Sequence, residues 1–205
     1  MSVNPIRPLC LYGAGGHGRV VGAQARRFLQ REVLFGDDRA TVPGLAIAFH
    51  DITAITGWDV VVTIGDNTTR RALQERLSPD QVAPALVMEP DRVFAVSIGP
   101  GSQILAGAII NPDAVIGTGV IVNSGAIVEH DCRIGDYCHI APGSVIGGGA
   151  QLGVGVLLGS NATVLPGIRI ADAAVIGAGA VVTRDITEAG TYVGVPARAL
   201  RGSTD

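Results

Sequence analysis

Aromatic side chains are scarce in this sequence: Phe, Trp and Tyr make up 4% of the 205 residues, whereas 47% are hydrophobic and 29 residues are glycine. A core of that size must be built from aliphatic side chains and alanine, with many backbone positions that need glycine. The chain is long enough for one large or two small domains. This composition favours a repetitive β architecture over an ordinary mixed domain.

An excess of basic charge and long apolar runs are also missing. The net charge is -3, which does not suit a phosphate backbone, so we expect no nucleic-acid partner. No unbroken run of about 18 apolar residues is present, which predicts no membrane span, and no secretory signal is visible. Cys10, Cys132 and Cys138 lack metal-ligand spacing. We therefore expect a cytoplasmic protein that binds no metal.

The first 90 residues alternate between short apolar runs and helical stretches. Strands are expected at residues 9–12, 33–35 and 60–64, and helices at about 19–30 and 67–77. Asn67 and the threonines after it are expected to cap the second helix. Strand, glycine turn, helix and strand in this order predict a small Rossmann-like βαβ domain with a parallel sheet.

A glycine-rich loop follows the first expected strand. Gly13, Gly15 and Gly18 satisfy G-x-G-x-x-G between a strand and a helix, where backbone N–H groups favour a pyrophosphate. The acidic pair Asp37 and Asp38 lies about twenty residues further on, in a position that suits a ribose or a base edge. By itself this motif suits NAD as well as a sugar nucleotide. The unit is, however, only about half of a full dinucleotide domain, and no hydride-transfer residues follow it.

From Ile98 onward the sequence repeats with a period of six. Every sixth residue is a branched aliphatic: Ile98, Ile104, Ile110, Ile116, Val122, Val128, Ile134, Ile140, Ile146, Leu152, Leu158, Val164, Ile170, Ile176 and Val182. Six is a multiple of two, so these residues face one side of a strand, whereas a helix face needs about 3.6. Three hexads make one coil of a parallel β-helix, with five coils between residues 98 and 187.

The positions beside each aliphatic have their own pattern. The residue two before it is usually small, and Cys132 and Cys138 occupy such inward positions. The residue after it is often glycine, as at Gly99, Gly117 and Gly135. We expect these glycines to supply the positive φ that tight corners need.

Four segments in this order resemble the PglD/NeuD-like sugar acetyltransferases: LYGAGGHGRVV, VTIGDN, IVEHDCRIGDYCHIAPG and YVGVPAR. The resemblance covers nearly the whole chain. It implies a Rossmann-like nucleotide-sugar-binding domain over residues 1–90 and a left-handed β-helix acetyltransferase domain over residues 91–205, assembled as a homotrimer. The family includes acetyl-CoA-dependent N-acetyltransferases for UDP- or GDP-linked amino sugars and sialic acid O-acetyltransferases.

The resemblance also assigns roles to single residues. It implies that His130 is the general base and that Asp131 orients it. Contacts to acetyl-CoA map onto His139, Gly148, Ser160 and Ala178, with Arg198 as a further candidate for a coenzyme phosphate. Contacts to the nucleotide sugar map onto Gly15, Gly16, His17, Asp37, Asp38, Gly65, Asp66 and Asn67.

The expected chemistry is direct acetyl transfer in a ternary complex. An imidazole titrates near neutrality and can take the proton of an attacking amine, while a carboxylate fixes its tautomer. A backbone N–H or His139 could stabilise the oxyanion. His130 and His139 are half a coil apart, so they point to opposite sides of a prism roughly 13 Å deep. One coil on from His130, Gly148 should lie directly above it, and the site should form at a seam between subunits.

Three other functions compete with an N-acetyltransferase. O-acetylation of a sialic acid or another sugar hydroxyl would use the same His130 and Asp131. A γ-type carbonic anhydrase shares this β-helix but needs three histidines on zinc, and only two of the four lie in the coils. A catalytically inactive nucleotide-sugar sensor or scaffold would not need the His130–Asp131 pair. A role in glycan or O-antigen biosynthesis is implied by the resemblance alone.

Overall fold

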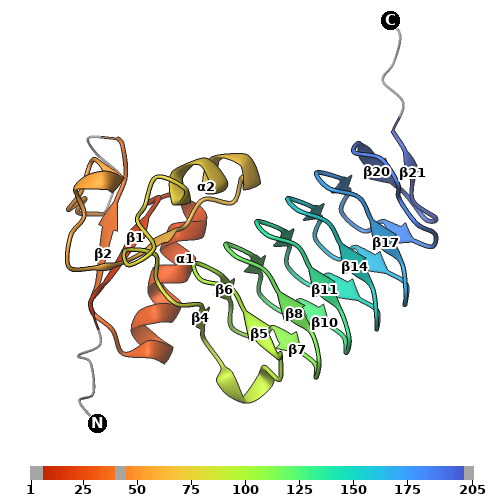
Figure 1. Ribbon diagram of the computed structural model, residues 1–205, viewed down its shortest axis with the longest axis horizontal. Helices are drawn as coiled ribbons and strands as arrows, with labels where there is room; N and C mark the ends of the chain where they lie inside the picture. Colours follow the sequence, from red (N-terminus) through yellow and green to blue (C-terminus); the bar gives the residue numbers. More distant parts are fainter. Residues whose placement is uncertain (1–6, 40–44, 201–205) are drawn as a thin grey trace, which may run out of the picture.

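The computed structural model describes residues 7–39 and 45–200. A small α/β domain at the amino-terminal end is followed by a long stack of coils (Figure 1). The predicted combination of a βαβ domain and a left-handed parallel β-helix is confirmed. None of the helices in the described ranges is long and apolar enough to cross a membrane.

The small domain is built on a parallel sheet of three strands in the order β2-β1-β3. Its strands are β1 (Leu9–Tyr12), β2 (Val33–Gly36) and β3 (Asp59–Val62), and the helical segments beside them are α1 (Gly16–Gln24), the π-helical η1 (Ala25–Leu29) and the 3-10 helix η2 (Ile52–Ala54). Every residue of β1 is buried, because side chains from both faces of this central strand enter separate apolar clusters. The alternation of apolar runs and turns therefore gives the expected two-sided sheet.

The first helix begins three residues earlier than expected, at Gly16 instead of Arg19. The glycine loop is so tight that a Cβ on Gly18 would lie 1.9 Å from the carbonyl oxygen of Gly13. This close packing lets the chain enter the helix directly after Gly15, which is the N-cap. Gly13 and Gly18 are thus needed for backbone approach, whereas a Cβ on Gly15 would meet no atom within 4 Å.

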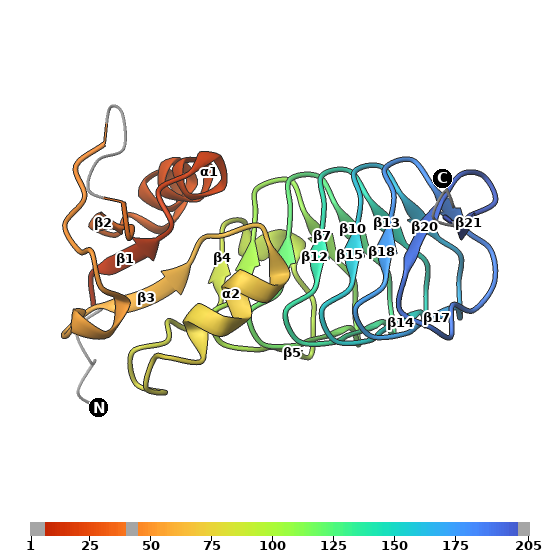
Figure 2. The ribbon, with the colours of Figure 1, turned by 90° about the horizontal axis from the view of Figure 1, so that it is seen from above.

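The second helix, α2, spans Asn67–Gln74 and lies between the small domain and the coils (Figure 2). Its cap is Asp66 and not Asn67: the Asp66 carboxylate accepts a hydrogen bond of 2.8 Å from the N–H of Thr69. The Asn67 side chain instead donates to the Gly155 carbonyl oxygen in the β-helix at 2.9 Å. A cap at the preceding residue leaves Asn67 available to join the two domains.

Fifteen strands of two residues each, from β5 to β19, form the coils, and each ends at one of the fifteen predicted aliphatics. The domain-facing sheet contains β4 (Leu86–Val87), β6 (Gln103–Ile104), β9 (Ile121–Val122), β12 (His139–Ile140), β15 (Leu157–Leu158), β18 (Val175–Ile176), β20 (Thr191–Val193) and β21 (Arg198–Ala199). The aliphatic sheet contains β7 (Ile109–Ile110), β10 (Ile127–Val128), β13 (Val145–Ile146), β16 (Thr163–Val164) and β19 (Val181–Val182). The polar sheet contains β5 (Ser97–Ile98), β8 (Val115–Ile116), β11 (Arg133–Ile134), β14 (Gln151–Leu152) and β17 (Arg169–Ile170).

The predicted inward positions form one continuous core. All of the repeated aliphatics except the half-buried Ile98 are buried, as are Cys132 and Cys138. The aliphatic sheet is named for its outward Ile109, Ile127 and Val145, and the polar sheet for its outward Arg133, Gln151 and Arg169. The domain-facing sheet is named for its contacts with the small domain. Hydrogen bonding of the coils begins at β4, which pairs with β6, and η3 (Pro90–Arg92) lies in the connection that follows.

The expected role of the glycines after the aliphatics is wrong. Positive φ occurs three residues after every repeated aliphatic except the last, Val182: at Gly101, Gly107, Asp113, Gly119, Gly125, Asp131, Tyr137, Gly143, Gly149, Gly155, Asn161, Gly167, Ala173 and Gly179. Gly99 and Gly135 do not have it. They are glycines because a Cβ there would lie 2.6 Å from backbone atoms of the next coil. Close stacking of coils, and not turn geometry, requires them.

Candidate active site

His130 lies at the corner between the aliphatic and polar sheets, after β10 and before β11. Its Nδ1 is 2.7 Å from Oδ2 of Asp131, and its side chain is 63% exposed. Asp131 has a φ of 62° at this corner, a left-handed conformation that Asp tolerates better than most residues. The contact assigns the hydrogen to Nδ1, so Nε2 is left as a free acceptor.

The hydrogen bond with Asp131 raises the pKa of His130, and the charges of Asp131, Glu129 and Asp113 raise it further. These carboxylates stabilise the imidazolium and so make the ring a stronger base. Gly148 lies beside the ring as expected: a Cβ there would be 2.7 Å from both Nε2 and Cε1 of His130. Only glycine leaves the ring undisturbed.

Ser160 and Ala178 lie at the opposite edge of the aliphatic sheet, at the corner that joins it to the domain-facing sheet. They stand at equivalent positions on adjacent coils, because the N–H of Gly179 donates to the Ser160 carbonyl oxygen at 2.9 Å. The expected coenzyme residues of one chain are therefore divided: Gly148 is on the His130 edge, and Ser160 and Ala178 are on the other edge.

The glycine loop forms one wall of a cavity of about 380 Å³ in the small domain. It is lined by Gly13, Gly15, Gly16, His17, Asp37, Arg39, Thr63, Ile64 and Gly65. Five of the expected nucleotide-sugar residues thus meet in one place. The Thr63 hydroxyl donates to the Gly13 carbonyl oxygen at 2.8 Å, which fixes the loop against the end of β3.

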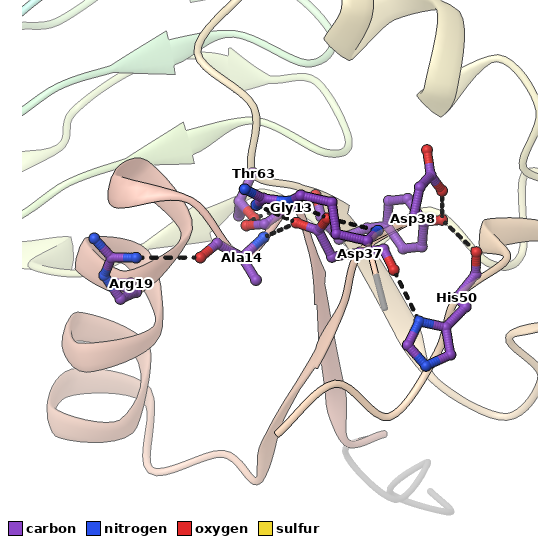
Figure 3. Close-up of polar contacts among 9 residues, drawn as sticks. Gly13, Ala14, Arg19, Asp37, Asp38, His50 and Thr63 are labelled. Atoms are coloured by element: carbon purple, nitrogen blue, oxygen red, sulfur yellow. Dashed lines mark hydrogen bonds and ion pairs between the residues drawn. The ribbon is translucent and has the colours of Figure 1, made fainter. Parts of the chain in front are cut away.

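The Asp37 carboxylate is held by the N–H of Ala14 in the glycine loop (Figure 3). It is also held by the side chain of Arg39. It accepts from the Ala14 N–H at 2.8 Å and from Arg39 at 2.8 Å, and the Arg39 hydrogen bond lowers the pKa of Asp37 most. Asp38 does not line the cavity, because the Tyr12 hydroxyl donates to its carboxylate. Of the acidic pair, only Asp37 faces the cavity, and it already has two partners.

His139 is enclosed between the two domains. Its Nδ1 is 3.1 Å from the Gly65 carbonyl oxygen, and its Nε2 is 3.1 Å from the Asn123 side-chain nitrogen. Burial lowers its pKa to about 4, so the ring is neutral near pH 7. Both ring nitrogens are engaged, which leaves no N–H for a thioester oxygen; the expected option of oxyanion stabilisation by His139 does not fit these contacts.

The glycine loop also meets the coils through His17. Its Nε2 is 3.0 Å from the side-chain oxygen of Gln103, whose amide nitrogen donates to the Val62 carbonyl oxygen at 3.1 Å. The rings of His17 and His139 are 6.2 Å apart, and burial lowers the pKa of His17. The floor of the cavity thus rests on the domain-facing sheet beside His139.

Three other expected residues lie elsewhere. Asp66 caps α2 and Asn67 joins α2 to the coils, so neither lines the cavity. Arg198 is exposed in β21, at the far end of the β-helix. Among the residues that the structure describes, no group of three or more His, Cys, Asp or Glu side chains is placed to hold a metal ion.

Sequence reasoning missed Arg39, which lines the cavity, and Arg70, which is completely buried between the domains. Arg39 has no sequence signal beyond its place after the acidic pair. Arg70 has one: Arg70, Leu73 and Leu77 follow the i, i+3, i+7 spacing of a buried helix face. An arginine on that face must find internal acceptors.

Both domains of the chain match families of known proteins. Residues 8–77 match the family model of the PglD N-terminal domain, and residues 113–148 match that of bacterial transferase hexapeptide repeats. The acetyltransferase domain of PglB from Neisseria gonorrhoeae FA1090 is 32% identical over 95% of this chain and 100% of that chain, with a TM-score of 0.86. The same domain in complex with acetyl coenzyme A is 32% identical over 95% and 99%, with a TM-score of 0.85.

A second relative is GDP-perosamine N-acetyl transferase from Caulobacter crescentus, solved as a variant with CoA and GDP-perosamine. It is 31% identical over 98% of this chain and 100% of that chain, with a TM-score of 0.86. Both relatives are described as acetyltransferases, and the match covers 100% of each of those chains. With a glycine-loop cavity, a His130–Asp131 pair and this degree of identity, the chain belongs to the PglD/NeuD-like family of sugar acetyltransferases.

Proposed function

We propose that the protein transfers the acetyl group of acetyl-CoA to the amino group of a GDP- or UDP-linked amino sugar. The observation that carries this proposal is the His130–Asp131 pair, with a free Nε2 directly beside Gly148. The relatives solved with acetyl coenzyme A and with CoA and GDP-perosamine support both substrates. The cavity at the glycine loop supports a diphosphate, because backbone N–H groups and the start of α1 favour an anion.

The reaction is a direct transfer without an acyl-enzyme. The amine nitrogen attacks the thioester carbonyl carbon while Nε2 of His130 takes a proton from that nitrogen. The tetrahedral intermediate then expels the coenzyme A thiolate, to which the imidazolium returns the proton, so the products are an amide and free coenzyme A. Among the described residues no acceptor is found for the N–H of Gly148, and we assign this N–H to the developing oxyanion.

A trimer would complete this site from two chains. The aliphatic sheet presents Ile109, Ile127 and Val145 outward, half-buried in the single chain, in contrast to the exposed arginines of the polar sheet. His130 lies at one edge of that sheet and Ser160 at the other. In a cyclic assembly one edge meets the opposite edge of its neighbour at every seam, which would bring His130 to the neighbour's coenzyme residues.

In this arrangement the substrates have separate places. Coenzyme A would run along the seam past Gly148 of one chain and His139, Ser160 and Ala178 of the next. The nucleotide would lie on Gly15, Gly16 and His17, with Asp37 and Gly65 as further contacts in the cavity. Asp38, Asp66 and Asn67 have other partners outside the cavity and are not needed for this placement. We place the reaction in the cytoplasm, as part of glycan or O-antigen biosynthesis.

A turnover screen tests the proposal. Acetyl-CoA is offered with GDP- and UDP-linked 4-amino sugars, with a free amino sugar and with sialic acid, and release of the coenzyme thiol is measured. We expect turnover of at least one nucleotide-linked amino sugar. Acetylation of sialic acid alone would overturn the assignment in favour of O-acetylation. His130→Ala removes the proposed base, so the same screen on that variant should show turnover lowered by about 10²–10⁴-fold.

A further inference from the structure

Arg70 is an arginine with no exposed surface, held in α2 between the two domains. It donates hydrogen bonds at 2.7 to 3.2 Å to the carbonyl oxygens of Ile64, Gly65, Gly119, Tyr137 and Cys138 and to the side-chain oxygen of Asn67. All six acceptors are uncharged, and burial lowers the pKa of Arg70 to about 10. A leucine would avoid the desolvation of a cation, but it would leave buried carbonyl oxygens such as those of Gly119 and Tyr137 without this donor. The guanidinium is therefore explained by the groups that it holds in place.

The acceptors of Arg70 belong to two functional segments. Ile64 and Gly65 lie at the end of β3 and line the nucleotide cavity. Tyr137 and Cys138 directly precede His139 in β12. One rigid guanidinium therefore fixes the cavity wall and the segment that carries His139 at a constant separation.

The two segments also touch each other at a single atom. The Gly65 carbonyl oxygen accepts from Nη1 of Arg70 at 3.2 Å and from Nδ1 of His139 at 3.1 Å. Asn123 completes the chain: its side-chain oxygen accepts from the Ser124 N–H at 2.8 Å, which turns its amide nitrogen toward Nε2 of His139. His139 is thereby fixed as the Nδ1–H tautomer.

We propose that Arg70 is a positioning residue that couples the nucleotide cavity to the acetyl-transfer site, by holding the Gly65 carbonyl oxygen against Nδ1 of His139. The proposal rests on the proposed function, because His139 is there assigned to the coenzyme. A diphosphate bound against Gly65 shifts or stiffens this peptide, and the shared carbonyl passes the change to the His139 ring. Nucleotide and coenzyme then bind with a mutual coupling free energy.

The test measures the dissociation constant of coenzyme A by calorimetry, with and without saturating GDP or UDP, on the full chain. For the wild type we expect the nucleotide to tighten coenzyme A binding about fivefold or more. Arg70→Lys keeps the charge but not the planar fork. In this variant the ratio of the coenzyme A dissociation constants without and with nucleotide should fall to about 1, while each ligand still binds alone. The control is Arg71→Lys, on the next residue of α2, which pairs with Glu75 in solvent and should keep the wild-type ratio.

A second measurement needs no variant and is unaffected if Arg70→Lys fails to fold. In protein labelled with ¹⁵N-histidine, the Nδ1 and Nε2 shifts of His139 report its tautomer. We expect the Nδ1–H form, and a change in these shifts when GDP or UDP is added without coenzyme.

Two results would overturn the coupling: a wild-type ratio retained in Arg70→Lys, or a His139 signal that ignores a bound nucleotide. Failure of both diphosphates to bind would overturn the nucleotide cavity itself, and the coupling with it. Binding without coupling would leave the proposed function intact and reject only the role of Arg70.

Discussion

The free corner at His130 and the domain junction at His139 place the same side chain in opposite surroundings. His130 is 63% exposed and carboxylates raise its pKa, whereas His139 is half-buried between the domains and its pKa falls to about 4. His130 keeps one nitrogen free, while both nitrogens of His139 have partners from its own chain. The comparison separates an imidazole that is free to exchange a proton from one whose two nitrogens are held in a fixed, neutral state.

The largest expected effect is at the free corner. His130→Ala removes the proposed base, and kcat should fall by about 10²–10⁴-fold with little change in coenzyme binding. Coenzyme release under saturating substrates measures the fall. Gln151→Ala, an exposed change on the polar sheet, is the control and should leave kcat unchanged. An active His130→Ala enzyme would show that the exposed imidazole is not the base.

Moving the ring without removing it should have the next largest effect. Gly148→Ala introduces a Cβ 2.7 Å from Nε2 of His130, so the ring must move away by roughly 1 Å to reach van der Waals contact. A displacement of about 1 Å can cost on the order of 10²-fold in rate. Steady-state kinetics, with circular dichroism to verify the fold, would detect it. Wild-type kcat in this variant would mean that the precise place of the ring is unimportant.

The half-buried His139 should change how the stability of the protein depends on pH. Its folded pKa of about 4 lies below the value of about 6.5 in an unfolded chain. The unfolded state therefore binds more protons between these values, and stability is lost as the pH falls from 6.5 toward 4. We expect a loss of about 2 kcal/mol from this group between pH 7 and 4.5.

Denaturant unfolding of wild type and His139→Gln at both pH values measures this loss. The variant should show a smaller fall in unfolding free energy than the wild type. His50→Gln, a change at an exposed histidine, should behave as the wild type does. Equal falls in His139→Gln and the wild type would contradict the half-buried, neutral state of His139.

The smallest effect concerns the partner of the base. Asp131→Asn keeps a side chain that accepts the left-handed corner but removes the charge that raises the pKa of His130. The acid limb of kcat/KM should move to lower pH, because the ring then loses its proton more easily. The plateau should fall by about tenfold, because the base is weaker. A pH profile with an unmoved limb would show that Asp131 does not act through His130.

The same contrast explains what the sequence can predict. Ile98 to Val182 repeat with the period of the coil, so strand positions, the inward cysteines and the place of Gly148 over His130 follow from counting. These features depend on neighbours within one coil or the next. The glycines after the aliphatics were misinterpreted because close approach of two coils leaves the same residue preference as a positive φ.

The domain junction could not be predicted in the same way. The enclosure of His139 depends on how the β3–α2 loop meets the coils, between residues as distant in sequence as Gly65 and His139. No repeat or local pattern encodes that docking. Only the burial of Arg70 had a signal, in its place on the same helix face as Leu73.

Subunit mixing tests the central claim, a site shared between neighbouring chains, most directly. Chains that carry His130→Ala are mixed with separate chains that carry Gly16→Asp, and the mixture is unfolded and refolded. Gly16→Asp places a carboxylate in the phosphate loop, at a position where a Cβ meets no atom within 4 Å. Each mixed trimer would contain one seam with an intact His130 and an intact nucleotide cavity, so an equal mixture should regain about a quarter of wild-type activity. Activity no higher than that of either variant alone would contradict a site formed at the seam.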